Sequence, residues 1–471
     1  MPPIFDEKYF LRRLHFKAQV CNLFCILNYY FRNYRSSGRG LIFWSVLQFE
    51  CFAVVANQAR ESAQLDGPLK HIRVLDLSRV LAGPWAGQTL ADLGAEVIKV
   101  ERPGVGDDTR GWGPPFLADR DGNPTSDAAY FLSANRGKKS VTIDFTRSEG
   151  QDLIKRLAAN CDIVLENFKV DGLAQYGLDY PSLKAINPGI IYCSITGFGQ
   201  TGPYRQRAGY DFLIQGMGGL MSVTGEPDNV ACGGPMKVGV AIVDIFTGMY
   251  ATTAVLAALA CRERSGVGQY IDLALLDVQV ATLANQATNY LVSGLPPGRL
   301  GNSHPNIVPY QVFATSDSHI ILAIGNDEQY RRFCAVAGSP QLATDDQYAT
   351  NAGRVHNRDI LIPLLCDIFK TRTKSWWIAE LEKAGVPCGP INTLEEVFAD
   401  PQVQARNMCT TVEHPVAGQI ALVGTPMKFS ATPAGALLPP PLLGEHTSEV
   451  LEQLFGIDNA EIVKLRDTGV I

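Results

Sequence analysis

The segment from Ile72 to Val100 constrains the fold of this chain more than any other, because it reads as one βαβ unit. Ile72–Leu77 is a short run rich in Leu and β-branched residues and predicts a strand. A turn follows, then a predicted helix at Trp85–Leu93 and a second predicted strand at Ala95–Val100. Two strands joined in this way run parallel, with a right-handed crossover.

The same alternation continues along the chain. Further strands are predicted at 140–144, 162–165 and 189–195, with a helix at 148–160 for which Ser148 is a plausible cap. Strands that alternate with helices are typical of α/β domains. The sequence therefore predicts a doubly wound, Rossmann-like α/β large domain.

A Gly/Pro-rich stretch at 294–298 marks a linker to a second, smaller α+β domain. Beyond it, a strand is predicted at 319–324 and helices around 327–337 and 356–385. A last helix is predicted at 448–454. With 471 residues, 46% of them hydrophobic, the chain is long enough for two such domains.

Charge and cysteine usage narrow the class of protein. The net charge of -6 argues against a protein that binds nucleic-acid backbone. The 11 cysteines include no Cys-x-x-Cys pair in the main body and no Cys/His ligand cluster. This pattern favours reduced thiols in a cytoplasmic protein and indicates no metal site.

Residues 1–66 differ in character from the rest. They contain an apolar run at 41–56 that Glu50 interrupts and that is too short to predict a spanning helix, so we expect no membrane association. A targeting segment is one interpretation, since Arg precedes the run, and it would place the protein in the mitochondrial matrix of a eukaryote. The interpretation we favour is an over-extended gene start.

Asp244 is the one charged residue in the small-residue run 238–248. An Ala-rich stretch at 251–260 predicts a helix just after it. The local interpretation is a helix N-cap, which Asp fills well. The alternative is a nucleophile, because carboxylates can form covalent intermediates and a helix N-terminus favours their anionic form. Local sequence favours the cap.

The first predicted βα turn carries glycine but lacks the Gly-x-Gly-x-x-Gly spacing. Glu101 imitates the ribose-binding acid of dinucleotide folds, so an NAD-dependent oxidoreductase is one alternative. Arg102 could engage a ligand phosphate or be a solvated surface residue. The basic loop 135–140 could likewise clamp an anionic nucleotide tail or be a solvated charge run. Glu166-Asn167-Phe168 follows a strand at the edge where doubly wound sheets bind ligands.

Taken in order, these blocks resemble the class III CoA-transferases, the CaiB/BaiF or formyl-CoA transferase family. The matching residues run from about 67 to 471: Val74–Leu77, Ala82–Pro84, Leu93–Glu101, Asn167-Phe168, Ile195–Gly199, Gly209–Asp211, Gly239–Gly248, Gly301-Asn302, His304-Pro305, Gly325–Asp327, Gly385–Pro390 and Leu443–Thr447. The blocks at 301–305 and 325–327 resemble those of members that use dicarboxylates such as succinate, glutarate or mesaconate.

The resemblance implies roles for individual residues. Asp244 matches the position of the family's catalytic aspartate, so the resemblance favours the nucleophile over the helix cap. The positions implied to line the CoA site are Leu81, Ala82, Arg102, Ile143, Thr146, Asn167, Phe168, Gln175 and Tyr210. Gln175 replaces a frequent Arg, Thr146 a frequent Lys, and Ala208 another basic residue, so we expect Arg136, Lys138 or Lys139 to supply phosphate contacts instead.

The family also contains 2-methylacyl-CoA racemases, which carry a His in a Gly-His-Asp motif. This chain has Gly209-Tyr210-Asp211, and a tyrosine with an ordinary pKa near 10 would be a poor proton-transfer partner. The resemblance therefore implies a transferase, acting through a covalent aspartyl intermediate on an acyl-CoA and a small carboxylic acid. It implies no permanently bound cofactor.

The resemblance also implies an interlocked homodimer and a division of the chain. Residues 1–66 lie outside the family pattern, and 67–293 form the first part of the large CoA-binding domain. A linker at 294–300 leads to the small domain at 301–395, and 396–471 return to the large domain.

Overall fold

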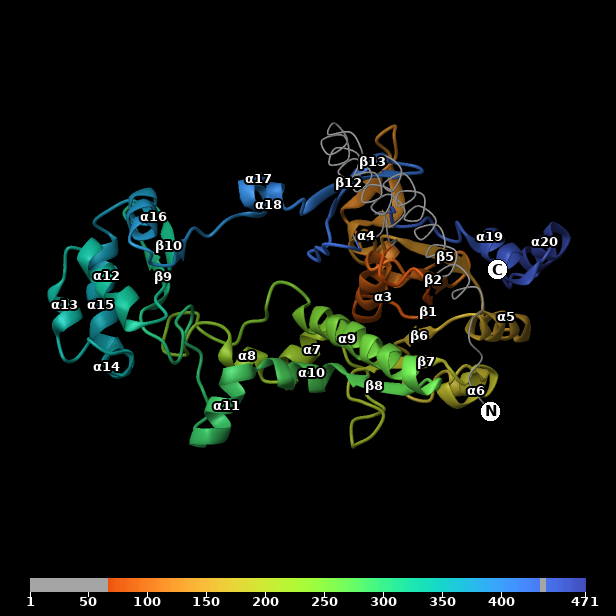
Figure 1. Ribbon diagram of the computed structural model, residues 1–471, viewed down its shortest axis with the longest axis horizontal. Helices are drawn as coiled ribbons and strands as arrows, with labels where there is room; N and C mark the ends of the chain where they lie inside the picture. Colours follow the sequence, from red (N-terminus) through yellow and green to blue (C-terminus); the bar gives the residue numbers. More distant parts are fainter. Residues whose placement is uncertain (1–66, 433–437) are drawn as a thin grey trace, which may run out of the picture. The chain divides into compact units, whose positions relative to one another are not determined.

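A six-stranded sheet is the centre of the α/β unit (Figure 1). The computed structural model describes residues 67–432 and 438–471. The strands are β1 (Arg73–Asp76), β2 (Glu96–Glu101), β5 (Lys138–Thr142), β6 (Ile163–Glu166), β7 (Ile191–Thr196) and β8 (Tyr270–Ala274). They lie in the order β5-β2-β1-β6-β7-β8, all parallel. This is the order of a Rossmann-type doubly wound sheet, so the fold predicted for this part is confirmed.

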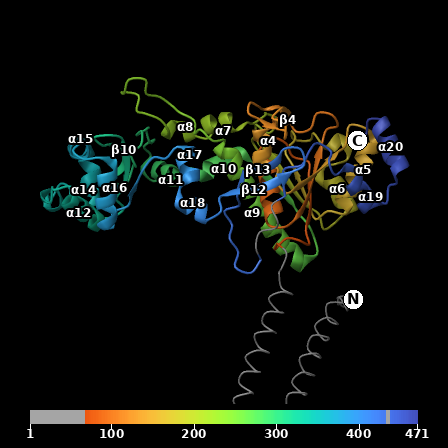
Figure 2. The same cartoon turned by 90° about the horizontal axis from the view of Figure 1, so that it is seen from above.

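Helices cover both faces of the sheet. On one face lie α5 (Ser148–Ala159), α6 (Tyr180–Ile186), α19 (Thr447–Phe455) and α20 (Asn459–Asp467), which group together in Figure 2. On the other lie α3 (Ala82–Asp92), α7 (Asp211–Met217), α9 (Ile242–Ser265) and α10 (Leu275–Thr282). Neighbouring strand residues alternate between the two cores, with Leu75 in the first and Val74 in the second. The strands are therefore apolar on both faces.

Helices α3 and α9 lie side by side because Gly248 permits a close approach (Figure 1). A Cβ atom at Gly248 would lie 2.7 Å from the carbonyl oxygen of Ala82 and 2.9 Å from the Cβ atom of Trp85. By length and composition α9 could cross a membrane. Its contacts with α3, β7 and β8 show it to be a core helix of the α/β unit.

A second group of elements has a core of its own. The antiparallel strands β9 (Tyr310–Ala314), β10 (His319–Ala323) and β11 (Cys388–Gly389) accompany α12 (Asp327–Val336), α13 (Gln341–Thr344), α14 (Asn351–His356), α15 (Arg358–Phe369) and α16 (Lys374–Lys383). The helix predicted over 356–385 is two helices, since Thr373 begins α16 by accepting a hydrogen bond from the Trp376 N–H.

The remaining elements are short. They are η1 (Asp108–Gly111), β3 (Phe116–Ala118), β4 (Pro124–Ala128), α4 (Ala129–Ala134), η2 (Ala174–Tyr176), α8 (Leu220–Val223), α11 (Ala284–Ser293), α17 (Leu394–Ala399), α18 (Pro401–Ala405), β12 (Cys409–His414) and β13 (Gly418–Val423). The chain then returns to the large sheet, where the Thr447 hydroxyl accepts a 3.0 Å hydrogen bond from the Thr142 N–H. The prediction of Ser148 as a cap is wrong, because Arg147 occupies that position. The interpretations of residues 1–66 lie outside the described residues.

Candidate active site

A cavity of about 520 Å³ opens at the carboxyl ends of β1, β6 and β7. In a doubly wound sheet this is the switch point, where the connections on either side of it leave a crevice for a ligand. The cavity brings together eight of the predicted site residues: Leu81, Ala82, Thr146, Asn167, Phe168, Gln175, Tyr210 and Asp244. Residues far apart in sequence therefore meet at one edge of the sheet.

A second cavity, of about 380 Å³, adjoins the first. It is lined by the other two predicted residues that follow strand ends, Arg102 after β2 and Ile143 after β5. Both cavities share Arg79, Phe145, Thr146 and Phe168 in their walls. Together they form an extended site along the carboxyl edge, suited to a ligand longer than either compartment.

Asp244 lies in the first turn of α9, as its third residue. The N-cap is Ala241, so the interpretation of Asp244 as a cap is wrong. The Asp244 carboxylate has no hydrogen-bond or ion-pair partner among residues 67–432 and 438–471. Burial, and then the nearby charge of Asp211, raise the pKa of Asp244 to about 7. Within the described residues, the carboxylate is thus free of hydrogen bonds and ion pairs, and Asp244 lies in the wall of the cavity.

Asp211 and Gln215 hold the segment that carries Asp244, a role that the sequence did not reveal. Asp211 Oδ1 accepts a 2.8 Å hydrogen bond from the Val243 N–H, which supplies the cap that Ala241 cannot. The buried Gln215 donates to Asp211 Oδ2 at 2.6 Å and accepts from the Val238 N–H at 2.9 Å. The signal for this role is the lack of a capping side chain ahead of a long helix.

Asn167 and Phe168 act on the first βα turn as well as on the cavity. Asn167 accepts from the Arg79 N–H at 2.9 Å and donates to the Arg79 carbonyl at 2.7 Å. The Phe168 ring packs edge to face on Phe145, and the Arg79 guanidinium lies 5.3 Å from its centroid. The amide of Asn167 is therefore already occupied by the protein backbone.

The basic residues of the loop 135–140 do not line either cavity, which corrects the expectation for Lys138. Lys138 is fully buried and donates 2.9 Å hydrogen bonds to Asp76 and to the Asn135 side chain. Arg136 is paired with Asp92, and Lys139 with Glu96 and Glu449. Each of these cations is held by a carboxylate of the fold, so none is available as a phosphate clamp.

Other cations lie in the cavity walls. Arg102, Lys169 and Arg207 have no carboxylate partner within the described part of the chain. Arg207 instead lies over the rings of Tyr204 and Phe198, 4.7 and 5.1 Å from their centroids. Unpaired cations around a cavity favour an anionic ligand. In the described ranges, no group of three or more His, Cys, Asp or Glu side chains is placed to hold a metal ion.

Tyr210 shares the cavity with Asp244 and is 64% exposed. It precedes α7, whose first residue is Asp211. Tyr130 lies near the same acids: burial, and then the charges of Asp244 and Asp211, raise its pKa. The Tyr130 phenol therefore stays protonated near neutral pH and can donate a hydrogen bond but not act as a base.

Comparison with known proteins gives a consistent result. The model of CoA-transferase family III matches residues 69–447. A succinate–glutarate CoA-transferase of Agrobacterium fabrum is 55% identical over 396 residues, which cover 83% of this chain and 96% of the relative. The human succinyl-CoA:glutarate CoA-transferase is 45% identical over 404 residues, 86% of this chain and 90% of the relative. A CAIB/BAIF family protein from Brucella suis has a similar structure, with a TM-score of 0.73 and 52% identity over 83% of this chain and all of that one.

Proposed function

Since this chain belongs to CoA-transferase family III, we propose that it moves CoA from succinyl-CoA or a similar donor to a dicarboxylic acid such as glutarate. Membership of this family sets aside the NAD-dependent alternative. The observation that carries the proposal is Asp244, an unpaired carboxylate in the wall of an extended cavity at the switch point of the sheet. Two relatives with printed names for succinate and glutarate support this pair of substrates.

The first half of the reaction makes an aspartyl thioester. The ionised Asp244 oxygen attacks the thioester carbonyl of the donor, and the carbon–sulfur bond breaks to release CoA thiolate. This leaves a mixed anhydride between Asp244 and the donor acyl group. The thiolate then attacks the Asp244 carbonyl of the anhydride, which expels the donor carboxylate and leaves Asp244 bound to CoA.

The second half repeats these steps in reverse with the acceptor. An acceptor carboxylate attacks the Asp244 thioester carbonyl, releases CoA thiolate and forms a new anhydride. The thiolate attacks the acyl carbonyl of the acceptor, which frees Asp244 and the new acyl-CoA. No proton is gained or lost overall, and exclusion of water protects the anhydride from hydrolysis.

In the proposed binding mode, CoA extends along the two adjoining cavities. Its phosphates would contact the unpaired cations Arg102, Lys169 and Arg207 in place of the basic residues of the loop 135–140, and its thioester would lie beside Asp244 and Tyr210. The positions of these residues in the cavity walls support this mode. Tyr210 stands where a racemase would need a base, so this arrangement supports transfer over racemisation.

We also propose a homodimer, because α9 and α11 leave large apolar side chains uncovered. Phe246, Met249 and Tyr250 are exposed on α9, and Leu291 and Val292 on α11 are 78% and 83% exposed. Exposed large apolar side chains of this kind are typical of a subunit interface. Analytical ultracentrifugation should give twice the chain mass of 51.2 kDa.

A substrate panel tests the activity directly. Succinyl-CoA, acetyl-CoA and oxalyl-CoA are each incubated with succinate, glutarate, mesaconate and citramalate, and the new CoA esters are identified by mass spectrometry. We expect exchange between succinyl-CoA and glutarate to be among the fastest. Absence of any new CoA ester across the panel would exclude the proposed function.

A further inference from the structure

Val80, in the loop between β1 and α3, has an unusual backbone conformation. Its φ is +71°, in the left-handed region that β-branched side chains rarely adopt. Val80 lines the large cavity together with Leu81 and Ala82. Such a conformation persists only where the surrounding structure imposes it. The contacts that impose it here come from side chains outside the loop.

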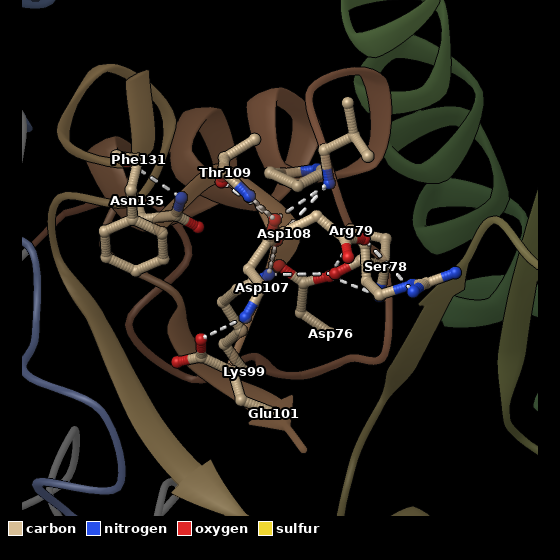
Figure 3. Close-up of polar contacts among 12 residues, drawn as sticks. Asp76, Ser78, Arg79, Lys99, Glu101, Asp107, Asp108, Thr109, Phe131 and Asn135 are labelled. Carbon is tan, nitrogen blue, oxygen red and sulfur yellow. Dashed lines mark hydrogen bonds and ion pairs between the residues drawn. The ribbon is translucent and has the colours of Figure 1, made fainter. Parts of the chain in front are cut away.

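Two buried residues hold the backbone on either side of Arg79 (Figure 3). Lys99 Nζ, from β2, donates a 2.8 Å hydrogen bond to the Ser78 carbonyl. The Asp107 carboxylate accepts from the Val80 N–H at 3.2 and 3.3 Å. Lys99 and Asp107 also pair with each other at 2.8 Å, and neither side chain is exposed to solvent. Both side chains lie in the wall of the second cavity, and neither lines the large cavity. Their hydrogen bonds to the loop are therefore their link to the large cavity.

The loop is in turn connected to the helix that carries Asp244. It leads directly into α3, whose first residue, Ala82, presents its carbonyl oxygen to Gly248 of α9. Gly248 lies one turn after Asp244. A Cβ atom at Gly248 would come within 2.7 Å of that oxygen, so the two helices are closely packed at this point. A shift of the loop therefore moves the cavity wall relative to Asp244.

We infer that the buried Lys99–Asp107 pair positions the acyl-CoA site: it holds the loop at Val80 in its strained conformation and so fixes the cavity wall against Asp244. Lys99 and Asp107 are positioning residues. The part of the inference that concerns turnover rests on the proposed function, whereas the part that concerns the loop does not. The competing explanation is that the pair only stabilises the fold.

Glycine at position 80 separates these explanations, because glycine adopts a positive φ without strain. Lys99→Met/Asp107→Leu removes both charges, so that neither is left unpaired in the interior. If the pair positions the loop, the double variant should lose kcat by roughly 10- to 100-fold, as expected for a misplaced reacting group. Adding Val80→Gly should restore at least part of that loss. If the pair only stabilised the fold, glycine at position 80 would not restore the kcat that the double variant loses.

The matched control is another buried ion pair. Arg136 and Asp92 are buried, lie outside both cavities and make no contact with the loop. Arg136→Met/Asp92→Leu should lower the thermal midpoint to a similar degree with kcat within about threefold of the parent, as expected for sites that share no partners. An equal loss of kcat in this control, or no recovery with Val80→Gly, would overturn the inference.

Amide hydrogen exchange gives a readout that needs no substrate. The peptide containing residues 78–82 should lose protection in Lys99→Met/Asp107→Leu and regain it when Val80→Gly is added. If the double variant does not fold, Asp107→Asn serves in its place, with the same loss and recovery expected in smaller measure. Unchanged protection of this peptide would reject the clamp even if transfer is observed. Loss and recovery of protection in a protein that shows no transfer would retain the clamp and reject the proposed function.

Discussion

Asp211 accepts a hydrogen bond from the Val243 N–H, the residue directly before Asp244, and its negative charge also raises the pKa of Asp244. One carboxylate thus orients the helix end on which the other lies and resists its ionisation. Burial is the larger cause of the raised pKa, which lies at about 7. The ionised fraction of Asp244 therefore changes steeply around neutral pH.

Removing the charge of Asp211 should move the pH profile of transfer. Asp211→Asn keeps an oxygen that can accept from the Val243 N–H but loses the bond that Gln215 donates to Oδ2. It also removes the negative charge, so the pKa of Asp244 falls and the acid limb of kcat/KM should shift to lower pH. Asp211→Ala loses the Val243 bond as well, at a further cost of about 1 kcal/mol or roughly fivefold in rate. A profile of unchanged midpoint in Asp211→Asn would show that Asp211 does not tune Asp244.

Neutralising Asp244 should abolish transfer and change the pH dependence of stability. The pKa of Asp244 is higher in the folded state than in the unfolded state. The contribution of Asp244 to the free energy of unfolding is therefore fully present below about pH 4 and is lost as pH rises through about 7. The asparagine of Asp244→Asn cannot ionise, so this variant does not lose stability as the pH rises through about 7. The variant should match the parent near pH 4 and exceed it at pH 8, by at most about 4 kcal/mol for three pKa units.

Chemical denaturation at the two pH values measures this difference. The control is Asp346→Asn, at an exposed position outside the cavities, which should leave both stability and transfer nearly unchanged. Hydroxylamine added during turnover should modify Asp244 and no other carboxylate. Near-normal transfer by Asp244→Asn would contradict a covalent role.

The unpaired cations of the cavity walls should govern affinity for CoA esters. Arg102→Ala should raise the KM for the acyl-CoA by about tenfold, the lower end of the range for a charge-assisted contact, because Arg102 is exposed. Lys169→Ala should act in the same direction, and both effects should shrink at high salt. Lys464→Ala, at an exposed cation on α20 paired with Glu461, serves as the control. A similar rise in KM for the control would point to a general charge effect.

The sequence predicted five of the six strands of the large sheet, because strands alternate with helices from residue 72 onward, but it did not predict β8. It also predicted where the strands end, and the cavities lie there. The sequence did not predict the buried ion pairs. Lys99 stands among apolar strand residues and is buried only because a parallel sheet is covered on both faces. Its partner, Asp107, lies in a loop eight residues later, and no periodic pattern in the sequence indicates that this loop folds back onto the strand.

The resemblance named residues most of which line the two cavities, but it could not show which side chains are already hydrogen-bonded within the protein. Lys138 was expected to contact a phosphate of CoA, and the structure places it between Asp76 and the Pro84 carbonyl. Asn167 reads as a ligand contact, yet its amide is bonded to Arg79. Hydrogen-bond partners of buried groups are set by tertiary packing, which one sequence does not reveal.

Transfer and racemisation make opposite predictions for the hydrogen on the α carbon of the acyl group. Racemisation needs a base beside Asp244, and Tyr210 supplies a phenol that stands 64% exposed in the same cavity. A chiral 2-methylacyl-CoA incubated with the enzyme in heavy water should therefore gain no deuterium at the α carbon. Succinyl-CoA and glutarate added to the same sample should yield a second CoA ester, which shows that the enzyme is active. Tyr210→Phe should leave this transfer within about tenfold of the parent, the loss of one hydrogen bond. Rapid deuteration without acyl exchange would instead identify a racemase and require another group, such as Asp211, to act beside Asp244.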